Sequence, residues 1–269
     1  MRREMLALAA CFILLAGCRQ LERLSFIRPD ASRGEFTKIA PRYEVSDSGQ
    51  KALPAAAESL VASAVSQYNA GNYNEAGQFA RQALKADPQL ADAHAILALL
   101  AERTGNSAEA GGHYLKAATL SPGVGIHANN YGTWLCANGR AAESLAWFDR
   151  ALADPNYPTR SAAFANAGTC AGRAGQADRA ETNWRNALAL DSNDVQSLAG
   201  MASLQFARGG YLDARAFVER WLALAPSDTE ALRLGSQIEQ KLGDSAAAQR
   251  YLSRLQAISP DSTTAPRSQ

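Results

Sequence analysis

Small and apolar residues recur along the chain at a period of 34 to 36 residues from about residue 57 onward. A glycine follows the first helical pattern of each period, at Gly71, Gly105, Gly139, Gly175, Gly209 and Gly243. A small residue lies five positions after each glycine, at Ala76, Ala110, Ser144, Ala180, Ala214 and Ala248. Prolines close most of the periods, at Pro88, Pro122, Pro226 and Pro260. A glycine at the end of one helix and a proline just past the next are helix stop signals, so each period predicts two helices.

This period resembles the tetratricopeptide repeat, a helix-turn-helix unit of about 34 residues. The six predicted units are residues 57–90, 91–124, 125–160, 161–194, 195–228 and 229–260. Two additional residues lengthen the turn between units three and four, within residues 154–158. Because one unit does not bury its apolar face alone, neighbouring units stack. The predicted fold class is therefore all-α, a right-handed tetratricopeptide-repeat solenoid over residues 57–260.

The N-terminus carries the pattern of a bacterial export signal. Arg2 and Arg3 precede an apolar run at residues 5–16, which is shorter than the roughly 20 residues that a bilayer crossing needs. Residues 1–17 are therefore predicted to be a lipoprotein signal peptide. Residues 15–18, with the sequence LAGC, resemble the lipobox, in which the cysteine is lipidated and becomes the first mature residue. The alternative is an ordinary signal peptide with an incidental cysteine.

Cys18 is thus the predicted lipidation site and membrane anchor, and Arg19 follows it. In the sorting rule for such lipoproteins an aspartate after the cysteine favours the inner membrane. Its absence indicates the inner leaflet of the outer membrane, facing the periplasm. Residues 18–56 are predicted to be an extended linker, and residues 261–269 a disordered tail. The apolar residues of the linker either fold back onto the helical domain or contact a partner: Leu24, Phe26, Ile27, Phe36, Ile39 and Tyr43.

Composition excludes several function classes. Hydrophobic residues make up 47% of the chain and charged residues 20%, which excludes wholesale disorder. A net charge of +1 argues against a nucleic-acid binder. The three histidines, His94, His113 and His127, are assigned to different units, with no cysteine or carboxylate at ligand spacing. We therefore predict no metal site, no catalytic residues, no cofactor apart from the lipid, and no small-molecule substrate.

Units three and four carry a more specific signature. It consists of Asn129-Asn130-Tyr131-Gly132, Cys136, Tyr157-Pro158, Asn166, Gly168 and Cys170. Together with the six repeats behind a lipobox, these residues resemble the PilF/PilW family of type IV pilus biogenesis lipoproteins. The resemblance covers roughly residues 58–260 and implies a pilotin, which binds a secretin subunit and promotes its targeting to the outer membrane and its multimerisation.

Two other features bear on that function. The linker is longer than is typical of the family, which leaves a different attachment geometry open. An adaptor for another outer-membrane assembly, such as a tight-adherence pilus or cell-wall machinery, is the alternative function. We expect the protein alone to be monomeric.

The concave groove of such a solenoid is lined by the first helix of each unit and binds protein segments. Asn130 and Asn166 occupy one repeat position, and Thr133 and Thr169 occupy the position three residues later, on the same helix face. The predicted partner-binding residues are Val61, Val65, Tyr68, Asn129, Asn130, Thr133, Asn166 and Thr169. The alternatives are that the amides cap or bridge neighbouring helices and that the apolar residues of unit one contact the linker.

Cys136 and Cys170 remain after Cys11 leaves with the signal peptide and Cys18 is lipidated. They lie one repeat length apart, late in the first helices of units three and four. Adjacent helix axes are about 8–10 Å apart, and disulfides persist in an oxidising compartment. We therefore predict a Cys136–Cys170 disulfide that joins these units; the alternative is two buried free thiols.

Overall fold

A computed structural model describes residues 55–258, and the regular structure within that range consists of twelve α-helices. The helices of units one to three are α1 (Ala55–Asn69), α2 (Tyr73–Ala86), α3 (Ala91–Arg103), α4 (Ser107–Leu120), α5 (Gly125–Ala137) and α6 (Ala141–Ala153). Those of units four to six are α7 (Arg160–Arg173), α8 (Ala177–Leu190), α9 (Val195–Ala207), α10 (Tyr211–Leu224), α11 (Thr229–Leu242) and α12 (Ser245–Ile258). The predicted all-α tetratricopeptide-repeat solenoid is confirmed.

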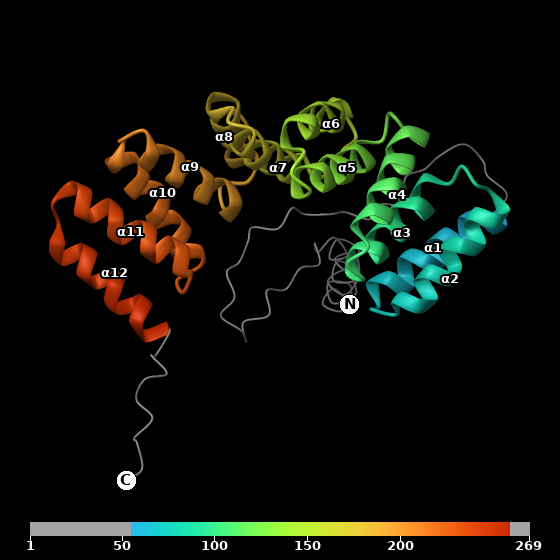
Figure 1. Cartoon of the computed structure of the whole chain (residues 1–269), viewed down its shortest axis with the longest axis horizontal. Coiled ribbons are helices and arrows are strands. Elements are labelled where there is room, and N and C mark those ends of the chain that lie inside the picture. Colours follow the sequence, from blue (N-terminus) through green and yellow to red (C-terminus); the bar gives the residue numbers. More distant parts are fainter. Residues whose placement is uncertain (1–54, 259–269) are drawn as a thin grey trace, which may run out of the picture. The chain divides into compact units, whose positions relative to one another are not determined.

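Each odd-numbered helix packs against the even-numbered helix that follows it, and each pair packs against the next (Figure 1). The six helix pairs correspond to the six predicted units, with starts that differ by at most two residues. The predicted signal peptide, the lipidation site Cys18, nearly all of the linker and the tail lie outside the described residues.

The turn within every unit uses the glycine that marks the period. The six glycines have φ between +75° and +84°, a conformation that glycine adopts without the strain of a Cβ atom. In unit three the N–H of Gly139 donates to the carbonyl of Cys136 at 3.4 Å, and the N–H of Arg140 donates to the carbonyl of Leu135 at 2.9 Å. This pattern satisfies the last carbonyls of the helix before the chain reverses.

Small residues allow helices of neighbouring units to approach closely around Trp184. A Cβ atom at Gly168 would lie 2.5 Å from the Trp184 ring, and one at Gly200 would lie 2.3 Å from it. The indole of α8 therefore occupies a slot between glycines of α7 and α9. Trp184 of unit four therefore packs directly against α9 of unit five.

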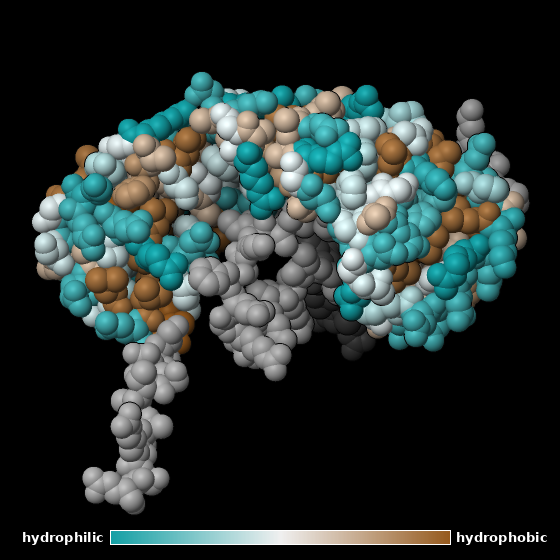
Figure 2. All heavy atoms as spheres, in the orientation of Figure 1, coloured by the Kyte–Doolittle hydropathy of each residue, from teal (hydrophilic) through white to brown (hydrophobic). Residues whose placement is uncertain are grey.

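Large exposed hydrophobic residues are distributed over many units. Leu120, Leu190, Leu224 and Ile258 each end the second helix of a unit and are 37–58% exposed. On the face shown in Figure 2, hydrophobic residues appear in separate patches among hydrophilic ones. Among the helices described, none combines the length and apolar character that a bilayer crossing would require.

Candidate functional site

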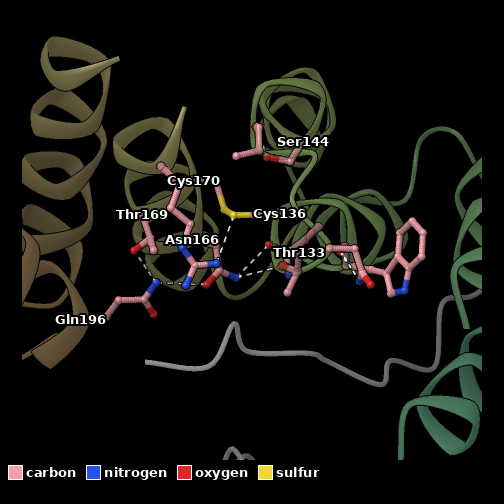
Figure 3. Close-up of a disulfide and its surroundings, with 12 residues drawn as sticks. Thr133, Cys136, Ser144, Asn166, Thr169, Cys170 and Gln196 are labelled. Carbon is pink, nitrogen blue, oxygen red and sulfur yellow. Dashed lines mark hydrogen bonds between the residues drawn. A yellow bond between two sulfur atoms is a disulfide. The ribbon is translucent and has the colours of Figure 1, made fainter. Parts of the chain in front are cut away.

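The candidate site is the junction of units three and four, where α5 and α7 lie side by side. Cys136 of α5 and Cys170 of α7 form a disulfide with their Cα atoms 5.8 Å apart. Both residues are buried, with exposed fractions of 3% and 1%. The predicted disulfide is therefore present, and it joins the first helices of consecutive units directly (Figure 3).

Beside the disulfide, five polar residues form a hydrogen-bonded set that we call the amide bridge: Asn129, Thr133, Asn166, Thr169 and Gln196. The Nδ2 group of Asn166 donates to Oδ1 of Asn129 at 3.3 Å and to Oγ1 of Thr133 at 3.4 Å. The Nε2 group of Gln196 donates to Oγ1 of Thr169 at 2.9 Å and to Oδ1 of Asn166 at 3.4 Å. The bridge thus connects α5, α7 and α9, one helix from each of three units (Figure 3).

The amide bridge bears on the predicted partner-binding residues of units three and four. The structure brings Asn129, Thr133, Asn166 and Thr169 together, and all except the half-buried Thr169 are buried. Asn130 is also buried on α5. The hydrogen bonds are those of the alternative in which the amides bridge neighbouring helices. Contact of the same residues with a partner stays a prediction.

Two members of the site were not predicted. Gln196 is 4% exposed and extends the bridge to unit five. Its position on the first turn of α9 gave no signal, because in neighbouring units the matching position holds unrelated residues such as Ala162 and Glu230. Arg173 donates from Nη1 to Sγ of Cys136 at 3.7 Å. A guanidinium beside a disulfide has no periodic signature in a sequence.

The lengthened turn after unit three is organised by Asp154. Its carboxylate accepts hydrogen bonds from the N–H groups of Gly125 and Asn156, both at 2.8 Å. Arg160, the first residue of α7, donates to the carbonyl oxygens of Leu152 at 2.9 Å and Asp154 at 3.2 Å. The two inserted residues therefore form an ordered turn that sets where α7 begins, and with it where Cys170 lies.

The predicted apolar residues of unit one lie apart from the junction. Val61 is buried in the core between α1, α2 and α3, and Val65 packs against the same core. Tyr68 packs on the next core cluster, which includes Leu99 and Ala98 of α3, and its ring centroid is 5.4 Å from that of Tyr73. Burial raises the pKa of the Tyr68 phenol above its ordinary value. The structure does not bring these residues together with the amide bridge.

The titratable residues of the described helices include the three histidines, His94, His113 and His127. Across residues 55–258 no three histidine, cysteine, aspartate or glutamate side chains are arranged to hold a metal ion. The assignment of the histidines to three different units is wrong. His94 and His113 both belong to unit two, because they lie on its two helices, α3 and α4. Their ring centroids are 5.2 Å apart. The fold is that of a protein-interaction scaffold.

Comparison with known proteins agrees with this architecture. A family model described as tetratricopeptide repeat matches residues 61–124 and 166–229. The type IV pilus assembly protein PilF of Pseudomonas aeruginosa is 28% identical over 192 residues, which are 71% of this chain and 76% of PilF.

Two solved structures of type IV pilus proteins are similar to this chain in sequence and in fold. The crystal structure of PilW, described as a widely conserved type IV pilus biogenesis factor, is 30% identical with a TM-score of 0.69, and the match covers 77% of this chain and 95% of PilW. A structure of Pseudomonas aeruginosa PilF is 26% identical with a TM-score of 0.69, and its match covers 77% and 93% of the two chains.

Proposed function

Because this chain belongs to the PilF/PilW family of type IV pilus biogenesis proteins, we propose that it is a pilotin, an outer-membrane lipoprotein that binds a secretin subunit. In this role it promotes delivery of the subunit to the outer membrane and its assembly into a multimer. The observation that carries the proposal is the match to PilW over 95% of that chain, which extends over the repeat array.

The proposal assigns separate tasks to the two parts of the protein. A lipidated Cys18 holds the chain on the membrane, since two or more acyl chains bind firmly where one gives only marginal affinity. Residues 18–56 connect this anchor to the helices. The repeat array, which begins at Ala55, captures the secretin subunit. A captured subunit is thereby kept at the membrane in which it assembles.

The junction of units three and four supports capture by a surface that is already formed. The disulfide and the amide bridge fix the relative positions of α5, α7 and α9 through directional bonds. A surface held in its binding geometry loses less conformational entropy when a partner binds. We propose that residues on the first helices of units one, three and four (α1, α5 and α7) contact the secretin. Within the predicted set, Val65, Tyr68 and Thr169 are the residues that are only partly buried.

The proposal is tested by deleting the gene and measuring detergent-resistant secretin multimers together with twitching motility. Deletion should abolish or strongly reduce both, and the wild-type gene should restore them. A Cys18→Ala variant should accumulate as an uncleaved or soluble form and restore multimers poorly. Undiminished multimers and normal twitching in the deletion strain would exclude the pilotin function and favour an adaptor role in another envelope assembly.

A further inference from the structure

Two imidazole rings form the contact between the two helices of unit two. His94 of α3 is buried, with 6% of its surface exposed, and the side chain of His113 on α4 is 20% exposed. Their Nδ1 atoms are 2.9 Å apart, and the ring centroids are 5.2 Å apart. The nitrogen atoms therefore face each other at hydrogen-bond distance, and one proton lies between them.

The partners of the outer nitrogens determine where the remaining protons go. Nε2 of His94 lies 3.3 Å from the carbonyl oxygen of Pro88, which only accepts, so this nitrogen carries a hydrogen. In the neutral pair, Nδ1 of His94 is then the acceptor and Nδ1 of His113 the donor. Nε2 of His113 then carries no hydrogen, and it lies 3.9 Å from a carboxylate oxygen of Glu109.

The two available protonation steps differ in their consequences. A first added proton at Nε2 of His113 leaves the contact between the rings intact and faces the Glu109 carboxylate. A second added proton has only Nδ1 of His94 to occupy. There it removes the acceptor of the bond between the rings and places two imidazolium groups against each other.

We propose that His94 and His113 form an acid-released latch, which holds α3 against α4 until His94 is protonated and then lets the two helices of unit two separate locally. The latch is distinct from the proposed secretin binding and does not depend on it.

The surroundings of the two rings disfavour their protonation in the closed state, as the latch requires. Burial and the neighbouring His113 lower the pKa of His94 to about 4. Burial also lowers the pKa of His113, while Glu109 acts in the opposite direction. The charged groups that shift the pKa values of the two rings are Glu109 and Lys116 of α4, and Lys116 disfavours protonation of both rings.

The sign and size of the effect follow from linkage. His94 binds its proton with a pKa of about 4 in the closed state and near 6.5 when exposed to water. The open state therefore gains protons first as the pH falls, and closure weakens between about pH 6.5 and pH 4. Between pH 7 and pH 5 the open fraction should rise by about 20-fold for one such group.

His127 provides an internal contrast. Its Nε2 atom lies 3.2 Å from Oδ1 of Asp92, so that the third histidine joins α5 to α3 opposite a carboxylate. Nε2 of His127 faces this carboxylate and not a second imidazole. His127 therefore belongs to the contact of α3 with α5 and serves as a control for the contact of α3 with α4.

The latch is tested by hydrogen exchange with mass spectrometry on the full mature protein at pH 7 and pH 5, corrected for the intrinsic pH dependence of exchange. Peptides from α3 and α4 should lose protection by about 20-fold, whereas peptides from α9 and α10, which contain no histidine, should change little. The H94Q variant keeps a hydrogen-bonding side chain but removes the titration of His94, and it should remove most of the difference between the two pH values.

Two further variants keep the test decisive if H94Q does not fold. H113Q removes one imidazolium and should reduce the pH effect on α3 and α4, whereas the matched control H127Q should leave it unchanged. The latch is overturned if α9 and α10 lose as much protection as α3 and α4. It is also overturned if H113Q retains the full pH effect, or if the wild type shows none.

Discussion

Two junctions of the same solenoid are held together by different interactions. At the junction of units three and four, α5 and α7 are connected by the Cys136–Cys170 disulfide and by hydrogen bonds from Asn166. At the junction of units five and six, large apolar side chains meet, among them Trp221 of α10 and Leu232 of α11. The first junction adds a covalent bond and directional hydrogen bonds to a buried apolar cluster that includes Leu145, Phe148 and Ala167, whereas the second depends mainly on buried apolar area.

The sequences of the two incoming helices explain the difference. In α7 the one large apolar side chain is Phe164, and the rest of the helix consists mainly of alanine, glycine and small polar residues. In α11 four large aliphatic residues are present: Leu232, Leu234, Ile238 and Leu242. A helix with small apolar side chains gains less from burial than one with large ones. The disulfide and the hydrogen bonds therefore add to the packing of α7 in the cluster around Phe148 and Trp184.

Polar interactions at the second junction are accessory. Arg215 of α10 forms a bidentate ion pair with Glu239 of α11, which is 3% exposed. Arg254 of α12 donates to the carbonyl oxygen of Pro226 at 2.7 Å, across the turn between the units. These contacts fix the position of helices that already bury apolar side chains. The comparison indicates that a repeat array can supplement the packing of small side chains with specific bonds at a single junction.

The largest expected effect is the loss of the disulfide. A C136A/C170A double variant should lose about 3–4 kcal/mol of unfolding free energy, because the bond closes a loop of 34 residues in the unfolded chain. Chemical denaturation of the mature protein, produced in the periplasm, measures the loss. Reductant should destabilise the wild type by a similar amount and leave the double variant unaffected.

Thiol labelling of the unfolded, unreduced protein provides the control for this prediction. The mature wild-type chain should show no reactive thiol from Cys136 or Cys170, since both sulfurs are in the disulfide. Two reactive thiols would mean that the junction of units three and four is held without a covalent bond, and the contrast between the two junctions would disappear.

The apolar junction should respond to a different change. L232A removes a fully buried side chain from the cluster between units five and six and should cost about 3 kcal/mol. Denaturation with and without reductant should give the same loss, since the Cys136–Cys170 disulfide lies at the other junction. L212A is the matched control, because Leu212 is 67% exposed on α10 and its truncation should change stability by less than about 0.5 kcal/mol. Equal losses in the two variants would refute the apolar account of this junction.

The sequence predicts the path of the backbone better than it predicts the contacts between side chains. The period of Gly71 to Gly243 fixed the number of units, because each glycine terminates a helix through its own backbone conformation. The disulfide followed from spacing, since residues one repeat apart lie on adjacent helices. Both features depend on the position of a residue within the repeat, which the sequence gives directly.

Two contacts between side chains on neighbouring helices were not predicted. The bond from Gln196 to Thr169 requires a particular rotamer on α9, and neither residue type specifies it. The contact between His94 and His113 requires the two helices of unit two to align across their turn. A buried amide can equally serve a fold or a partner, so the function of Asn166 could not be read from its repeat position.

The smallest expected effect separates these two roles for Asn166. N166A removes the central amide of the bridge, which leaves Gln196 with one acceptor fewer, and should cost about 1–2 kcal/mol in chemical denaturation. N186A is the matched control, because Asn186 is exposed on α8 and its truncation should change stability by less than about 0.5 kcal/mol. If the amide bridge is structural, secretin multimers should recover when N166A is assayed well below its melting temperature. If multimers fail although the unfolding free energy is unchanged, Asn166 contacts the partner, and the first junction is held by the disulfide without help from the amide.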